Sequence, residues 1–164
     1  MWVGLLALVL AGSVIAAFAV MTPQTDEPYG TWNKTDQDVA ISGYDTVAYF
    51  TKGRPVKGDA AISYAWRDAN WRFATQSHRD MFAADPDQYV PEFGGFCAAA
   101  MTYGAVAKAD PERWAIVDGK LYLNYDDYAY QVFHEKLAEN IAKAEEKWAQ
   151  KIEAEIQTRT AQTR

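Results

Sequence analysis

The sequence predicts an α+β fold, a small domain of two β-hairpins and short helices with a long C-terminal amphipathic helix. Two stretches alternate apolar and polar residues on either side of a turn, a pattern typical of antiparallel hairpins. Residues 127–158 instead repeat apolar side chains every three or four positions, as one face of a helix does. We therefore expect residues 36–126 to form the domain and residues 127–158 to pack on it.

The first hairpin is expected between Ile62–Trp66 and Trp71–Phe73, with Arg67–Asn70 as the turn. Both strands alternate large apolar side chains with small or polar ones. One face of this hairpin should therefore lie against a core.

The second hairpin has the strongest local pattern in the chain. Trp114–Val117 and Leu121–Asn124 flank Asp118-Gly119, a dipeptide that favours a tight two-residue hairpin turn. Leu121 and Leu123 are two positions apart, so they should share one face of the strand.

Two short helices are expected between the hairpins. Ser77 with Asp80 is a capping pattern, which predicts a helix over His78–Ala84 with Met81 and Phe82 facing the core. Asp85-Pro86 should end this helix. A second helix is expected over Phe96–Tyr103, because Gly94-Gly95 precedes it and Gly104 follows it.

The long helix carries a continuous apolar stripe that should bury against the domain. Glu139 and Lys143 are one turn apart and should form a supporting ion pair. Lys143, Lys147 and Lys151 form a basic line that is typical of a solvated face. Residues 159–164 are a polar tail. The stripe consists of Phe133, Leu137, Ile141, Ala144, Trp148, Ile152 and Ile156.

The amino terminus predicts export. Trp2–Met21, WVGLLALVLAGSVIAAFAVM, is apolar or small throughout and long enough to cross a bilayer as an N-terminal hydrophobic helix. Alternatively, residues 1–21 are a signal-peptide region with Ala17-Phe18-Ala19 as a small-x-small cleavage site. Both interpretations place the domain in the periplasm or outside the cell, either membrane-anchored or secreted. Residues 22–35, with Pro23 and Pro28, have the composition of a linker.

The charge and the cysteine content of the chain limit which partners and cofactors it can bind. The formal net charge of −6 and the pI near 4.9 exclude the basic surface that nucleic-acid binding requires. The single cysteine, Cys97, excludes an internal disulfide and a four-thiolate zinc motif. The membrane is a partner if the N-terminal helix is uncleaved, and the sequence does not identify a protein partner.

Three segments together resemble the YHS-domain family in its exported single-domain form. They are Ser42–Asp59 (SGYDTVAYFTKGRPVKGD), Tyr64–Ala100 (YAWRDANWRFATQSHRDMFAADPDQYVPEFGGFCAAA) and Lys108–Tyr125 (KADPERWAIVDGKLYLNY). A weaker match continues through Asn140–Trp148. The resemblance implies a small α+β domain related to TRASH-type metal-binding domains.

The resemblance carries over only part of a metal site. Metal-binding relatives have Asp-Pro-Val-Cys where this chain has Asp45–Ala48, and Phe-Cys-x-x-x-Cys where it has Phe73–His78. Alanine therefore stands at two of the three thiol positions, and His78 stands at the third. Cys97 belongs to a segment specific to the exported form.

Cys97 is the centre of the candidate metal site. In a helix, Cys97 and Met101 stand on one face, and thiolate and thioether donors together favour copper in its Cu(I) state. His78 would add an imidazole from the neighbouring helix. A position near a helix N-terminus favours the thiolate form. The sequence thus predicts a binding module for a soft transition metal, copper first, held by Cys97, Met101 and His78.

Two other interpretations of Cys97 stay open. In the first, Cys97 is a small buried apolar residue of an interaction or structural module, since free cysteine and methionine both fill cores. In the second, it is the thiol of a redox sensor, which requires an exposed Cys97 without a soft neighbour. His78 at a helix start and His134 on the long helix are expected to be solvent-facing unless they bind the metal.

Catalysis is not expected. The chain has no nucleotide-binding loop, no histidine pair at metal-ligand spacing and no Gly-x-Ser-x-Gly elbow. Asp85-Pro86-Asp87 and Asp126-Asp127 resemble paired carboxylates, but they read as a turn and a helix start.

Overall fold

The computed structural model describes residues 32–162, which form an α+β domain with two separate two-stranded antiparallel sheets. The predicted fold class is confirmed for this part of the chain. The expected N-terminal hydrophobic helix and residues 22–31 of the linker lie outside the described residues. The elements in chain order are η1 (Ile41–Gly43), α1 (Thr46–Lys52), β1 (Asp59–Trp66), β2 (Ala69–Phe73), α2 (Gln76–Ala84), α3 (Pro86–Tyr89), η2 (Glu92–Gly95), α4 (Ala98–Met101), β3 (Asp110–Val117), β4 (Lys120–Asn124), α5 (Asp127–Glu135) and α6 (Leu137–Gln162).

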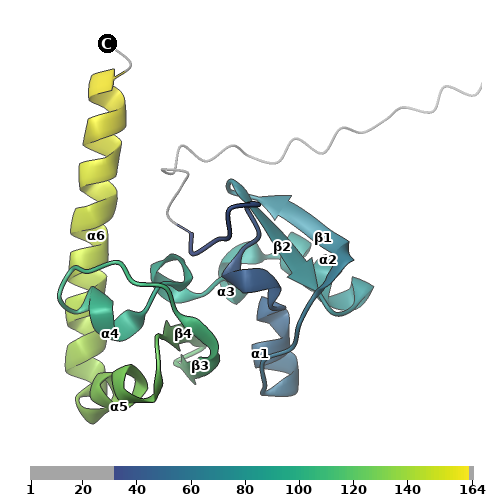
Figure 1. Cartoon of the computed structure of the whole chain (residues 1–164), viewed down its shortest axis with the longest axis horizontal. Helices are drawn as coiled ribbons and strands as arrows, with labels where there is room; N and C mark the ends of the chain where they lie inside the picture. Colours follow the sequence, from purple (N-terminus) through teal and green to yellow (C-terminus); the bar gives the residue numbers. More distant parts are fainter. Residues whose placement is uncertain (1–31, 163–164) are drawn as a thin grey trace, which may run out of the picture.

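The second hairpin lies between two groups of elements. Figure 1 shows β1, β2, α1 and α2 on one side of β3 and β4, and α4, α5 and α6 on the other side. Within residues 32–162, no helix has both the length and the apolar composition needed to cross a membrane.

The first cluster of buried residues fills the space between the first hairpin, α1, α2 and β4. It is rich in aromatic rings that meet edge to face or at a tilt, and such pairs stabilise a core beyond the area they bury. Its largest members are Ile41, Val47, Tyr49, Trp71, Phe73, Phe82, Leu121 and Leu123.

The second cluster joins α4 to β4 and the C-terminal helices. Its buried members are Phe93, Cys97, Ala98, Ala99, Met101, Tyr122, Phe133 and Ala144. Strand β4 contributes to both clusters, because Leu121 and Leu123 face the first while Tyr122 faces the second. The predicted shared face of Leu121 and Leu123 is thereby confirmed.

Both predicted hairpins are present, and the turn of the first is tighter than expected. Trp66 pairs with Ala69, so Arg67-Asp68 alone form the turn. Both residues have positive φ, 44° and 61°, the conformation of a two-residue hairpin turn that glycine and asparagine adopt most easily. Arg67 and Asp68 are neither of these residue types, so a turn this short was not predicted from the sequence.

The helix predicted at residues 78–84 begins two residues earlier, as α2. The Thr75 hydroxyl, and not that of Ser77, caps it by accepting a hydrogen bond from the His78 N–H at 3.1 Å. Ser77 lies inside the first turn. The helix ends at Ala84 as predicted, and Pro86 begins the short helix α3.

The helix predicted over Phe96–Tyr103 is shorter than expected. Only Ala98–Met101 is α-helical, and the Gly94-Gly95 pair belongs to the turn η2. Gly95 has φ 76°, and its carbonyl oxygen accepts a hydrogen bond from the buried Asn33 amide at 3.0 Å. The glycine pair therefore permits the close approach of another backbone segment, as the sequence suggests.

The predicted single helix over residues 127–158 is two helices, α5 and α6, which meet at Lys136. No proline or glycine marks the break. Instead, the Asn140 side chain donates hydrogen bonds to the carbonyls of Val132 and Phe133, both at 3.0 Å. These bonds supply donors to carbonyl oxygens in the last turn of α5 that would otherwise lack a helical partner. The apolar stripe packs on the second cluster as far as Trp148, whereas Ile156 is 45% exposed.

Candidate functional site

Cys97 is buried in the second cluster. The residue caps α4 and is 2% exposed, and its N–H donates to the Ala107 carbonyl at 2.9 Å. It also forms a parallel bridge with Leu123 of β4. The backbone around the thiol is therefore fixed on two sides.

A buried amide lies beside this thiol. The Asn124 Oδ1 is 4.0 Å from Cys97 Sγ and accepts a hydrogen bond from the Ala99 N–H at 3.2 Å. Asn124 is fully buried, and its Nδ2 has no hydrogen-bond partner among the residues that the structure describes. Asn124 could not be singled out from the sequence, because its place beside the thiol depends on the pairing of β4 with the Cys97 segment.

The predicted metal set is only partly assembled. Met101 shares the second cluster with Cys97, and its N–H donates to the Cys97 carbonyl at 3.1 Å. His78 is instead held by Asp45 and Thr51 on α1. Within residues 32–162, no group of three or more His, Cys, Asp or Glu side chains is placed to hold a metal ion.

The expectation that His78 faces solvent is wrong. His78 is 6% exposed, and its Nδ1 lies 2.6 Å from Oδ2 of Asp45, which is fully buried. The sequence could not show this burial, because the partner carboxylate is 33 residues away. His134 is half-buried and stacks on Tyr130, with ring centroids 4.0 Å apart, so it too is not simply solvent-facing.

Asp45, His78 and Thr51 form a hydrogen-bonded array that the sequence did not predict. Asp45 Oδ1 accepts from the N–H groups of Val47 and Ala48, which makes Asp45 the cap of α1. Its Oδ2 accepts from the Ala74 N–H at 2.8 Å in addition to the His78 ring. His78 Nε2 lies 3.1 Å from the Thr51 hydroxyl.

Asp45 could have been found from the sequence as a helix cap, because Asp before Thr46 is a typical N-cap arrangement. Its contact with His78 depends on the packing of α1 against α2. Asp45 and His78 lie in the two segments where the resemblance described above predicts the thiol positions of a metal-binding domain. The structure thus brings those two segments together, although the side chains that meet there bind each other.

Ionisable groups border the second cluster. Burial raises the pKa of Tyr122 to about 12, with the Glu92 carboxylate as a further cause. Burial also raises the pKa of Glu92, although Lys120 at 3.5 Å opposes that shift. Lys120 also pairs with Glu145 at 3.2 Å, so one ammonium group links β4 to η2 and α6.

Exposed aromatic side chains lie near the second cluster. Tyr103 follows α4 and is 81% exposed, while Tyr125 and Tyr128 lie between β4 and the first turn of α5. Val106 is also exposed. Among the described residues, these are four of the five large apolar side chains that are exposed, the fifth being Ile156.

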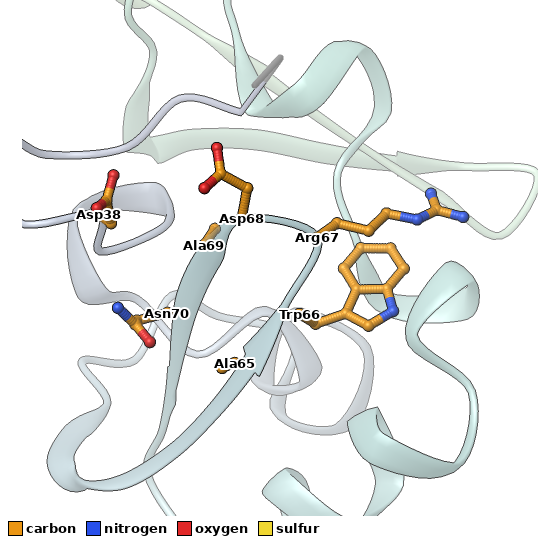
Figure 2. A pocket seen from close by; sticks show the side chains of 7 residues that line it. All are labelled: Asp38, Ala65, Trp66, Arg67, Asp68, Ala69 and Asn70. Carbon is orange, nitrogen blue, oxygen red and sulfur yellow. The ribbon is translucent and has the colours of Figure 1, made fainter. Parts of the chain in front are cut away.

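A shallow pocket of about 330 Å³ lies at the turn of the first hairpin, away from these sites. Figure 2 shows the Arg67 side chain along the Trp66 ring on one side and Asp38 and Asp68 on the other. Lys34 bonds to both carboxylates, at 2.8 and 2.9 Å, so each already has a cationic partner within the chain. None of the residues predicted as metal ligands lines this pocket.

No protein-family model matches the sequence, and neither a curated protein nor a solved structure matches the chain.

Proposed function

We propose that this chain is an exported YHS-type binding module that acts through protein contacts, with Cys97 as part of its core. The observation that carries the proposal is the enclosure of the thiol. Cys97 is 2% exposed and belongs to the same buried cluster as Phe93, Tyr122 and Phe133. A thiol buried in such a cluster behaves as a small apolar residue, not as an accessible ligand or redox group.

The exposed tyrosines supply the contact surface of this proposal. Tyrosine is enriched at protein interfaces, because a rigid apolar ring and a polar hydroxyl contribute to binding together. Tyr103 follows α4, Tyr125 follows β4 and Tyr128 lies in α5, and all three elements contribute buried side chains to the second cluster. The packed core around Cys97 would then hold this surface rigid.

The test places a photo-crosslinking residue at Tyr103, Tyr125 or Tyr128 of the full chain in living cells. Gln157, which is exposed on α6, is the matched control position. We expect a discrete crosslinked partner from at least one tyrosine position and none from Gln157. Equal crosslinking at all four positions, or none at any, would contradict a specific contact surface. Cell fractionation of the same strains tests the proposed export.

Thiol reactivity tests the core role of Cys97. We expect the native protein to react with an aromatic disulfide reagent at least about 10²-fold more slowly than the urea-unfolded protein, since the thiol must first be exposed by opening. Similar rates in the two states would show that the thiol is accessible, which would contradict the proposal.

A soft-metal module is the second candidate, with copper as the metal. One observation favours it, which is that Cys97 and Met101 lie one helical turn apart in the same cluster. A thiolate and a thioether at this spacing suit Cu(I). His78 has no part in this version, because its ring is bonded to Asp45 and Thr51.

A Cu(I) competition titration tests the second candidate. Tight one-to-one binding that Cys97→Ser abolishes and Met101→Leu weakens would support it. His78→Asn is the control and should bind as the unaltered chain does. Binding no stronger than that of Cys97→Ser would exclude the copper site and leave the interaction module.

A further inference from the structure

The Asp45–His78–Thr51 array runs from the core to the surface. Asp45 is fully buried, His78 is nearly so, and Thr51 is exposed in the last turn of α1. The hydroxyl is therefore the end of the array that a reagent in solution can reach.

The protons of the array can be assigned from its partners. The Asp45 carboxylate accepts three backbone N–H groups, so the ring of His78 must donate to it through Nδ1. In the neutral imidazole, Nε2 then carries the lone pair. The Thr51 Oγ1 lies 3.1 Å from this nitrogen and also 3.1 Å from the Val47 carbonyl oxygen. Its single proton is shared between these two acceptors.

A carboxylate, an imidazole and a hydroxyl in this order can make the hydroxyl oxygen a stronger nucleophile. A carboxylate fixes the imidazole tautomer, and the free ring nitrogen accepts the hydroxyl proton as the oxygen attacks an electrophile. We propose that Thr51 is a site of covalent acylation by activated esters, with His78 as its general base and Asp45 as the positioning residue. This inference does not depend on the proposed binding function.

The step balances without a further reactant. Thr51 Oγ1 forms a bond to the acyl carbon, and the bond from that carbon to the leaving alkoxide breaks. The hydroxyl proton passes to His78 Nε2 and then to the leaving group. Since Thr51 lies at the carboxyl end of α1, where the N–H groups are already bonded in the helix, no oxyanion donors from α1 face the reacting carbon. Hydrolysis of the ester must also expel the threonine alkoxide, a much poorer leaving group than that of an activated ester, so the ester should last and the reaction should not turn over.

Thr158 provides an internal control. It is exposed on α6, and its hydroxyl donates to the Ala154 carbonyl at 2.9 Å, just as Thr51 donates to Val47. No histidine accepts from Thr158 in the described part of the chain. Both threonine hydroxyls therefore donate to a helix carbonyl, but only the Thr51 hydroxyl also lies beside an imidazole nitrogen.

The experiment treats the full chain with p-nitrophenyl acetate and locates acetyl groups by peptide mass spectrometry. We expect Thr51 to be acetylated about 10²-fold faster than Thr158, the usual lower bound for general-base assistance. Thr51→Ser should retain the reaction and Thr51→Val should abolish it at that position. His78→Asn, which keeps an N–H for Asp45 but has no base, should reduce the Thr51 rate to that of Thr158.

Equal acetylation of Thr51 and Thr158 would overturn the proposal, and so would a Thr51 rate unchanged by His78→Asn. Circular dichroism of each variant checks its fold. If His78→Asn does not fold, the Thr51 to Thr158 ratio in the unaltered protein still decides the question.

Discussion

His78 and Asp45 are 33 residues apart and meet at 2.6 Å in the interior, where the Asp45 carboxylate also caps α1. The Asp45 side chain thus caps α1 and also links α1 to α2 through His78. A buried carboxylate is stable only while its acceptor oxygens are satisfied.

Removal of the His78 imidazole should strongly destabilise the fold. His78→Ala leaves Asp45 one donor short and removes a buried ring, and we expect it to lower the free energy of unfolding by about 2–4 kcal/mol. His78→Asn places an amide N–H near the position of Nδ1 and should cost about 1–2 kcal/mol. Urea unfolding of both variants measures the difference. Equal losses would show that the contact with Asp45 contributes little.

Two glycines with the same backbone conformation should respond differently to alanine. Gly95 and Gly119 have φ of 76° and 77°. A Cβ on Gly95 would collide with Ile41, whereas one on Gly119 meets nothing within 4 Å. We expect Gly119→Ala to cost about 1–2 kcal/mol from backbone strain alone.

Gly95→Ala should cost about 2–5 kcal/mol, because overpacking against the buried Ile41 adds to the same strain. Thermal and urea unfolding of the two variants give the comparison. If the two losses are the same, the core around Gly95 accommodates the methyl group without cost.

Tyr122 should contribute to a loss of stability in alkaline solution, beside Tyr49, whose pKa burial also raises. The pKa of Tyr122 is about 12 in the folded chain and near 10 when unfolded, so the unfolded state loses its proton first as the pH rises. This contribution to stability is complete below pH 10 and is lost as the pH rises toward 12.

Tyr122→Phe should therefore show a shallower loss of stability between pH 10 and pH 12 than the unaltered chain. Urea midpoints at several pH values measure this slope. Tyr125→Phe, at an exposed tyrosine, is the control and should leave the slope unchanged. Identical slopes for all three proteins would contradict the assignment to Tyr122.

The two ends of α6 should differ in their contribution to stability. Trp148 packs against the second cluster, with its ring 6.2 Å from that of Phe93, while Ile156 is largely exposed. We expect Trp148→Ala to cost about 2–3 kcal/mol, less than a fully buried tryptophan, and Ile156→Ala to stay within about 0.5 kcal/mol. Urea unfolding tests both. A large loss for Ile156→Ala would show that the end of α6 has a partner in solution.

The sequence predicted the hairpins well, because alternation and the Asp118-Gly119 turn are local features. It predicted one long helix where there are two, since the break at Lys136 depends on the Asn140 side chain and not on proline or glycine. Helix α1 was not predicted, although Asp45 before Thr46 was a visible cap. Its apolar run is too short to show a helical period.

For the candidate site, the sequence predicted correctly only the grouping of residues that are close together in the chain. Cys97 and Met101 share a helix turn, and the structure keeps them together. His78 was grouped with them because it stands at a thiol position of the resemblance and on a neighbouring predicted helix, but in the structure its ring contacts Asp45. A side chain's partner across the fold depends on how α1 and α2 pack, and the spacing of residues along one segment carries no information about that.

Strand β4 alternates its side chains between two cores, with Leu121 and Leu123 on one side and Tyr122 on the other. Neither cluster is complete without this strand. If the chain were divided at β4, both fragments would expose apolar surface that is buried in the intact domain. The chain should therefore melt in a single cooperative transition, and amide protons of β4 should be among the last to exchange with deuterium.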